Sequence, residues 1–208
     1  MVERRLPDEM VVRQLVERAL EAAEAAKGTT SPTTGPAPVS MPSAAAASAA
    51  PPKTVAIGAD HGGFALKAVL AKHLAAQGYG VTDCGTNSAD AVDYPDFAHV
   101  VARLVASGAC AAGIVIDGAG IGSAMAANKV PGVRAANAHD TSMARNAREH
   151  NYANVLTLGA RMIGEGLATE ITDTFLATTW GAERHGKRVA RITDIEQRYS
   201  KPQAEEPR

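Results

Sequence analysis

The chain has 208 residues, with 21 Lys and Arg against 22 Asp and Glu, so its formal charge is −1 at pH 7. This length fits one full domain with an appendage and excludes two large domains. The balanced charge, without a basic block, argues against nucleic-acid binding. No apolar run approaches the roughly 18 residues of a membrane span. Aromatic residues are only 4% of the chain, so its apolar content is largely alanine, which suits a compact α/β domain.

The two cysteines, Cys84 and Cys110, lack the CxxC or His/Cys spacing of a zinc site or a disulfide framework. We therefore expect two reduced thiols, no metal site and a cytoplasmic protein. The first 27 residues mix Arg with Asp and Glu around no continuous apolar core, unlike a secretory signal.

Residues 1–27 form the first predicted unit, with an amphipathic helix over residues 8–26. Apolar side chains recur there at intervals of three and four residues; they are Val12, Leu15, Val16, Ala19, Leu20 and Ala23. Residues 28–52 are rich in Pro, Ala, Ser and Thr and carry no charge, which is typical of a flexible linker. A polar tail covers residues 200–208.

Over residues 53–199, short β-branched runs alternate with longer helical patterns, which indicates βαβ units and a parallel sheet. The predicted strands cover residues 54–58, 80–83, 113–116, 133–136 and 155–158. The predicted helices cover residues 64–77, 97–107, 122–129, 141–149, 164–178 and 183–199. We expect an α/β fold, a Rossmann-like αβα sandwich with a five-stranded parallel sheet, that binds ligands at the carboxyl ends of its strands.

The first predicted strand is followed by Asp60 and His61 among glycines, in Gly-Ala-Asp-His-Gly-Gly. A carboxylate and an imidazole thus stand where a ligand can approach the backbone, which makes acid/base chemistry possible. The alternative is that Asp60 only caps the next helix.

The third predicted strand leads through Asp117 into a segment that we call the Gly-rich loop, Gly118-Ala119-Gly120-Ile121-Gly122. Backbone N–H groups at a helix N-terminus favour an anion. Because a carboxylate is unfavourable beside a pure phosphate cradle, we expect Asp117 to take a proton from carbon. The loop amides would then stabilise the developing enolate oxygen. Alternatively, Asp117 is a structural cap or binds Mg²⁺.

Two further polar groups stand near the end of the domain. His150 and Asn151 end a predicted helix just before the fifth strand, at the sheet edge, where substrate hydroxyls can be met. Arg184 and Arg188 lie four residues apart on one helical face, a spacing that can grip a phosphate. A charged protein surface can show the same spacing.

Six motifs follow one another along the domain: Gly-Ala-Asp-His-Gly-Gly (58–63), Val-Asp-Tyr-Pro-Asp (92–96), Gly-Ala-Gly-Ile-Gly (118–122), Ala-Ala-Asn-Lys-Val-Pro-Gly-Val-Arg-Ala (126–135), Arg-Glu-His-Asn (148–151) and Asn-Val-Leu-Thr-Leu-Gly (154–159). Together they resemble the type B ribose-5-phosphate isomerase family, which includes galactose-6-phosphate isomerase subunits. The resemblance covers about residues 53–199. It implies a homodimer or dimer of dimers, active sites shared between two subunits, and no metal or organic cofactor.

The resemblance also implies catalytic roles, in an aldose–ketose isomerisation that passes through a cis-enediolate. Asp60 and His61 would lie in the sugar pocket, with His61 also near the phosphate. His150 would be the acid/base that opens the sugar ring, with Asn151 beside it. His185 is a competing candidate for ring opening.

The expected phosphate ligands are arginines, with Arg184 and Arg188 first and Arg134 and Arg161 as weaker candidates. Tyr94 would line the pocket. The amides of the Gly-rich loop would form the anion hole of the family.

The chain departs from the family at the base. Asp117 stands where many members have Cys, and Ser123 stands where another branch has its Glu. The hydroxyl residue usually found two places after the Cys is replaced by Ala119. A carboxyl is ionised at neutral pH without the lowered pKa that a thiol needs. Because it is then a weak base, we expect burial to raise the pKa of Asp117, or strong stabilisation of the enediolate.

The N-terminal helix and linker resemble the encapsulation peptides that deliver cargo enzymes into bacterial microcompartments. The apolar face within residues 8–26 would bind a groove of a shell protein or another cargo protein. A deoxyribose-phosphate aldolase would then be a conceivable companion in the compartment. The alternative is a self-packing or solvated extension.

The leading hypothesis is therefore an isomerase of ribose 5-phosphate and ribulose 5-phosphate with Asp117 as the base. The alternatives are the same chemistry on a six-carbon or deoxy sugar phosphate, and a sugar-phosphate-binding or assembly protein with little or no turnover. A nucleotide-binding module is disfavoured, because the Gly-rich loop lacks the Gly-Lys-Ser/Thr ending.

Overall fold

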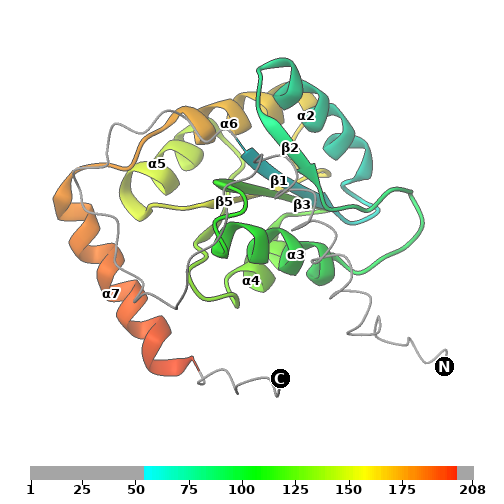
Figure 1. Cartoon of the computed structure of the whole chain (residues 1–208). Coiled ribbons are helices and arrows are strands. Elements are labelled where there is room, and N and C mark those ends of the chain that lie inside the picture. Colours follow the sequence, from blue (N-terminus) through cyan, green and yellow to red (C-terminus); the bar gives the residue numbers. More distant parts are fainter. Residues whose placement is uncertain (1–53, 201–208) are drawn as a thin grey trace, which may run out of the picture.

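The computed structural model describes residues 54–200 (Figure 1). The predicted helix over residues 8–26, the linker over residues 28–52 and the tail beyond residue 200 lie outside the described residues. No helix in the described part of the chain is long and apolar enough to span a membrane.

Strands and helices alternate along the described chain, as the sequence predicts. The strands are β1 (Thr54–Ala59), β2 (Gly80–Asp83), β3 (Ala112–Asp117), β4 (Ala135–Asn137) and β5 (Val155–Gly159). The helices are α2 (Phe64–Ala76), α3 (Tyr94–Ala106), α4 (Ile121–Ala127), α5 (Thr141–Asn151), α6 (Glu165–Ala177) and α7 (Glu183–Tyr199).

The five strands form one parallel sheet in the order β2-β1-β3-β5-β4. Helices α2, α5 and α6 cover one face of the sheet and α3 and α4 the other, while α7 projects away at the lower left of Figure 1. Every residue of β3 is buried, as expected for a strand covered on both faces. The predicted Rossmann-like α/β architecture is confirmed.

The strand order creates a crevice where β1 and β3 lie side by side. The chain leaves β1 towards β2 and leaves β3 towards the opposite side of the sheet, so α2 and α4 cover opposite faces. Such a reversal opens a ligand crevice at the carboxyl ends of the two strands. Asp60 follows β1 and Asp117 ends β3, so both reach this crevice.

Several element boundaries differ from the prediction. Helix α3 begins at Tyr94 instead of residue 97, because Pro95 suits the first turn of a helix and Asp93 is an extended N-cap. Helix α4 ends at Ala127 instead of residue 129. Asn128 uses its side chain there to bond the carbonyls of Ala124 and Ala135, both at 2.9 Å, in competition with further helix. Strand β4 covers Ala135–Asn137 instead of residues 133–136.

Gly63 is the point of closest contact between the start of α2 and the sheet. A Cβ atom on Gly63 would overlap the backbone carbonyl of Ile116 in β3, and backbone cannot move aside as a flexible side chain can. The crevice between β1 and β3 therefore requires glycine here.

We expect Gly63→Ala to lower the free energy of unfolding by about 1 to 3 kcal/mol, the usual cost of overpacking. The matched control is Gly166→Ala in α6, where a Cβ would meet nothing within 4 Å. This control should raise stability by about 0.4 to 1 kcal/mol, because alanine restricts the unfolded chain. Urea unfolding measures both, and a Gly63→Ala protein as stable as the wild type would contradict the close contact.

Candidate active site

Asp117, the last residue of β3, is held by the Gly-rich loop that follows it. Its Oδ1 accepts hydrogen bonds from the amides of Ala119, at 2.7 Å, and Gly120. Its Oδ2 accepts from both the amide, at 3.0 Å, and the hydroxyl of Ser123. Asp117 is 5% exposed. The carboxylate thus lies inside the loop and ties it to the start of α4.

The remaining amides of the loop are open. Among residues 54–200, the N–H groups of Gly118, Ile121 and Gly122 donate no hydrogen bond. Of the five loop amides expected to form an anion hole, two therefore donate to the Asp117 carboxylate and three are left for another acceptor. Gly120 has a φ of +78°, which favours glycine at the turn that aims these amides.

Two opposing effects, burial and hydrogen bonding, determine the pKa of Asp117. Burial raises it, but the hydrogen bonds from Ser123, Gly120 and Ala119 together lower it more, so the pKa lies below its usual value. Of the two expectations for Asp117, a net rise of the pKa is wrong, because four donors stabilise the charged form. The other expectation, strong stabilisation of the enediolate, stays a prediction. Asp117 is fully ionised at neutral pH.

Asp60 and His61 stand beside the Gly-rich loop. Asp60 is buried and its Oδ1 accepts a hydrogen bond from the amide of Gly63 at 3.0 Å, in the turn before α2. Gly63 is itself the N-cap of this helix, which has no side-chain cap, so the alternative that Asp60 caps α2 is wrong. His61 is exposed, and its Nδ1 lies 3.2 Å from the carbonyl oxygen of Val92.

Tyr94 and Arg161 complete the surroundings of the loop. The ring of Tyr94 packs against Gly122, where a Cβ would lie 2.6 Å from its Cε2. A Cβ on Gly118 would lie 3.7 Å from Nε of Arg161. We call this set the carboxyl-edge half, because it surrounds the carboxyl ends of β1 and β3; it comprises Asp60, His61, Tyr94, Asp117, Arg161 and the Gly-rich loop.

His150 and His185 meet at another place. Their rings stack with centroids 4.3 Å apart and planes 14° apart. Nδ1 of His150 lies 2.9 Å from the side-chain nitrogen of Asn146. His185 is buried, and within the described residues neither of its ring nitrogens has a hydrogen-bond partner.

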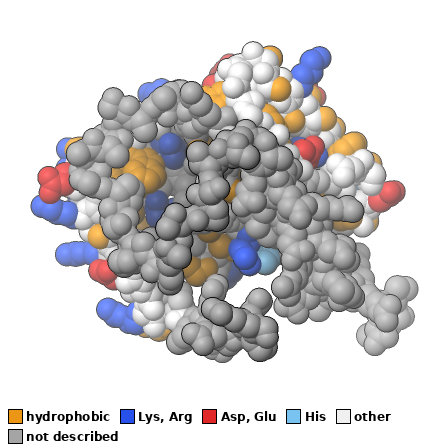
Figure 2. Space-filling model, in the orientation of Figure 1, with side chains coloured by type: hydrophobic (Ala, Val, Ile, Leu, Met, Phe, Trp, Pro, Cys, Tyr) orange, Lys and Arg blue, Asp and Glu red, His pale blue; other side chains and the backbone are white. Residues whose placement is uncertain are grey.

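The environment of His185 keeps it neutral. Burial lowers its pKa, the neighbouring His150, Arg184 and Arg188 lower it further, and Glu149 opposes this shift. Both arginines belong to α7, which lies where Lys and Arg side chains project from the left of the molecule in Figure 2. His150, with 39% of its side chain exposed, is the histidine that a substrate can reach.

Arg134, the weaker phosphate candidate, is engaged elsewhere. Its Nε donates to the carbonyl of Tyr152 at 2.9 Å, and its guanidinium lies 5.8 Å from the centroid of the Trp180 ring. Burial lowers its pKa, and Glu196 opposes this shift. We call the second set the amino-edge half; it comprises Arg134, His150, Asn151, Arg184, His185 and Arg188.

The two halves lie at opposite edges of the sheet. Helix α5 starts after the carboxyl end of β4 and ends before the amino end of β5, so it runs antiparallel to the strands (Figure 1). With 11 residues, it carries the chain about 16 Å from one edge to the other. The amide of Gly181, just before α7, bonds the carbonyl of Glu149 at 2.9 Å, which fixes α7 to the amino edge. One chain therefore does not bring Asp117 and His150 together.

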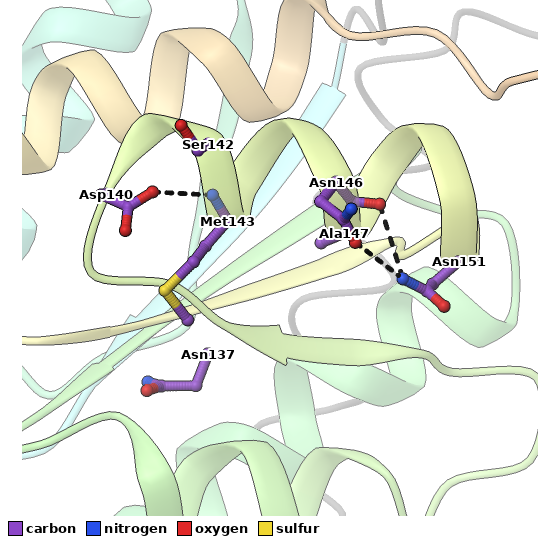
Figure 3. A pocket seen from close by; sticks show the side chains of 7 residues that line it. All are labelled: Asn137, Asp140, Ser142, Met143, Asn146, Ala147 and Asn151. Atoms are coloured by element: carbon purple, nitrogen blue, oxygen red, sulfur yellow. Dashed lines mark hydrogen bonds between the residues drawn. The ribbon is translucent and has the colours of Figure 1, made fainter.

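An open pocket of about 400 Å³ lies along α5 (Figure 3). It is lined by Asn137, Asp140, Ser142, Met143, Asn146, Ala147 and Asn151. At one end the Asn137 side chain lies 3.3 Å from the carbonyl of Ala119 in the Gly-rich loop. At the other end Asn151 contacts Asn146, as the dashed lines of Figure 3 show.

Sequence reasoning missed two polar residues of this region. Asn146 precedes His150 by four residues on α5, and this helical spacing could have revealed it. Asn137 ends β4 at the carboxyl edge, but no motif singles it out. Among residues 54–200, no group of three or more His, Cys, Asp or Glu side chains could hold a metal ion.

Comparison with known proteins decides the family. Residues 55–192 match the family described as Ribose/Galactose Isomerase. The chain belongs to this family. It is 44% identical over 146 residues to ribose-5-phosphate isomerase B of Escherichia coli, an alignment that covers 70% of this chain and 98% of that protein.

Solved structures agree with this assignment. A structure of ribose-5-phosphate isomerase B from Clostridium thermocellum is 50% identical, with a TM-score of 0.70, over 71% of this chain and 99% of that one. The structure of the Mycoplasma genitalium protein with bound ribulose-5-phosphate is 40% identical, with a TM-score of 0.67, over 69% and 96% of the two chains.

Proposed function

We propose that the protein interconverts ribose 5-phosphate and ribulose 5-phosphate as an aldose–ketose isomerase. The observation that carries the proposal is an ionised carboxylate, Asp117, at the end of β3, beside three amides without acceptors. The names of the relatives support the substrate class, and so does the ribulose-5-phosphate in the Mycoplasma genitalium structure. No cofactor takes part in the proposed reaction.

Ring opening is assigned to His150. Asn146 lies beside Nδ1 of His150, so the other ring nitrogen, Nε2, is the one assigned to protonate the ring oxygen as the ring opens. His185 is disfavoured for this role by its burial and lowered pKa. Asn151 stands beside His150 to meet a substrate hydroxyl, and Arg184 and Arg188 bind the phosphate.

Proton transfer between C1 and C2 is assigned to Asp117. The carboxylate takes the proton from C2 of the open-chain aldose and returns it to C1, while a proton moves from the 2-hydroxyl to O1. The cis-enediolate formed between these steps carries negative charge on oxygen. The free amides of Gly118, Ile121 and Gly122 are suited to stabilise that charge. The neighbouring side chains of His61, Tyr94, Asp60 and Arg161 would surround the sugar.

The complete site requires two copies of the chain, because the carboxyl-edge half and the amino-edge half lie at opposite edges of the sheet. We propose a homodimer, or a dimer of dimers, in which each site takes one half from each subunit. Apolar side chains beside the Gly-rich loop support such an interface: Ile121 is 53%, Met125 65% and Met162 60% exposed.

Replacing the base tests the proposal. Asp117→Asn keeps the shape of the side chain and removes the base, so ribose 5-phosphate turnover should fall by at least about a hundredfold, the scale of general base catalysis. The matched control is Asp173→Asn in α6, an aspartate that pairs with His73 away from the loop, which should stay within about twofold of wild type.

A variant Asp117→Asn that keeps a tenth or more of the turnover would exclude Asp117 as the base. The intact protein also separates the alternatives. Turnover of a six-carbon or deoxy sugar phosphate, with ribose 5-phosphate inert, would correct the substrate. Binding without turnover of any of these would favour a sugar-phosphate-binding protein, in which Asp117 is a structural cap.

We also propose that residues 1–52 add microcompartment targeting to this isomerase. The family match begins only at residue 55, and the alignment covers 98% of the Escherichia coli enzyme without using 30% of this chain. The isomerase domain is thus complete without the extension. The apolar face within residues 8–26 would bind a shell or cargo protein inside a cytoplasmic compartment, with an aldolase of deoxyribose phosphate as a possible neighbour.

Deleting residues 1–52 should leave turnover within about twofold of wild type and abolish co-purification with co-expressed shell proteins. In the full chain, Leu15→Glu/Leu20→Glu should also abolish co-purification, because charge on the apolar face prevents its burial. The control Glu17→Gln/Glu21→Gln changes the polar face and should leave co-purification intact. Unchanged co-purification of the deletion variant would refute targeting by this segment.

A further inference from the structure

The carboxylate of Asp117 has no open acceptor position in this structure. An ionised carboxylate offers about four lone-pair sites. Oδ1 already accepts from the amides of Ala119 and Gly120, and Oδ2 from the amide and the hydroxyl of Ser123. A base needs a free lone pair to take a proton from carbon. One of these four hydrogen bonds must therefore break before Asp117 can act.

The four donors differ in their freedom to move. Three are backbone amides, fixed by the loop and by the first turn of α4. The fourth is the hydroxyl of Ser123, whose Oγ can move away from Oδ2 through a change of side-chain rotamer while the backbone stays in place. Ser123 is completely buried, so its hydroxyl cannot turn to bulk water and needs another acceptor within the site.

Ser123 directly follows Gly122, whose amide donates no hydrogen bond among residues 54–200. In the proposed function this amide binds the enediolate, so the oxygens of a bound sugar are the acceptors that the Ser123 hydroxyl would meet. Residue 119, where the family resemblance expects a hydroxyl, is Ala in this chain. In the carboxyl-edge half, the hydroxyl that reaches the base comes from Ser123 instead.

We infer that Ser123 is a positioning residue whose hydroxyl holds Oδ2 of Asp117 in the free protein and turns to an oxygen of the bound sugar phosphate. One hydrogen bond is exchanged for another, and Oδ2 becomes open to the proton of the substrate. The inference rests on the proposed function, in which Asp117 is the base.

This exchange of hydrogen-bond partners by Ser123 would also raise the basicity of Asp117. Among the hydrogen bonds that lower the pKa of Asp117, the one from the Ser123 hydroxyl lowers it most. When the hydroxyl turns away, the ionised form loses this support, so the carboxylate becomes more basic in the complex than in the free protein. The base is thus strengthened only when substrate is present.

The test observes the carboxylate directly in the full-length protein, labelled with ¹³Cγ-aspartate, at pH 7. The Asp117 signal is assigned as the one that disappears in Asp117→Asn. The probe is ribitol 5-phosphate, an open-chain polyol phosphate that cannot isomerise, and its ³¹P signal reports binding. In the wild type, we expect the Asp117 signal to shift when the probe binds.

In Ser123→Ala, the signal of the free protein should already lie near that of the wild-type complex, and the change on binding should fall below half of the wild-type change. The matched control is Ser107→Ala, which deletes a hydroxyl bonded to the Leu104 carbonyl at 3.1 Å, at the end of α3. The control should respond as the wild type does.

A bound probe that leaves the wild-type signal unchanged would overturn the inference, and so would a full wild-type response in Ser123→Ala. In either case Ser123 is a fixed cap of Asp117. Failure of the proposed function is recognised separately: the probe then does not bind by ³¹P, or Asp117→Asn retains turnover. Both of these results would also refute the exchange.

Discussion

The carboxyl-edge half depends on the four hydrogen bonds that Asp117 accepts from the Gly-rich loop and Ser123. Each hydrogen bond to a charged group contributes about 1.5 to 3 kcal/mol, so four of them can offset the cost of burying a carboxylate, which is several kcal/mol. The same bonds shape the loop, in which three further amides donate no hydrogen bond among residues 54–200. They also make Asp117 a weak base, because they stabilise its charge. The hydrogen bonds that stabilise the buried Asp117 therefore also reduce its basicity. Loss of the bond from the Ser123 hydroxyl on substrate binding, as inferred above, would restore basicity and leave the other three bonds in place.

The second constraint is the direction of α5. A helix that joins the carboxyl end of one parallel strand to the amino end of the next must place its last residues at the amino edge. His150 and Asn151 are such residues, and α7 is fixed beside them by the contact between Gly181 and Glu149. The proposed ring-opening group and the proposed phosphate-binding arginines thus lie at one edge of the sheet, and the proposed base lies at the other. A site shared between subunits follows from this topology if all of them act on one sugar phosphate.

The elements were predictable because their signals are local. Buried β-branched runs alternate with helical patterns, and each predicted strand overlaps an observed one. The errors come from single side chains that compete with the backbone: Asn128 ends α4 early, and Pro95 lets α3 begin early.

The site was harder to predict, because its chemistry depends on three-dimensional contacts. The spacing of residues 117–122 indicated an anion-binding loop, but not that the Asp117 side chain would occupy two of its amides. The sign of the Asp117 pKa shift was wrong for the same reason, since burial was foreseen and the four donors were not. The stacking of His150 on His185 joins residues 35 positions apart in the numbering, and no local pattern reports it. The motifs of the family supplied the identities of these residues, and the fold supplied their separation.

The most direct test of the account asks whether the two halves work together across subunits. Asp117→Asn and His150→Asn, each inactive alone, are co-expressed with different affinity tags, and the mixed oligomer is purified through both tags. Each mixed dimer then has one site built from two intact halves, so the account predicts about half of the wild-type turnover per dimer. Mixed oligomers no more active than either variant alone would contradict a site shared between two chains.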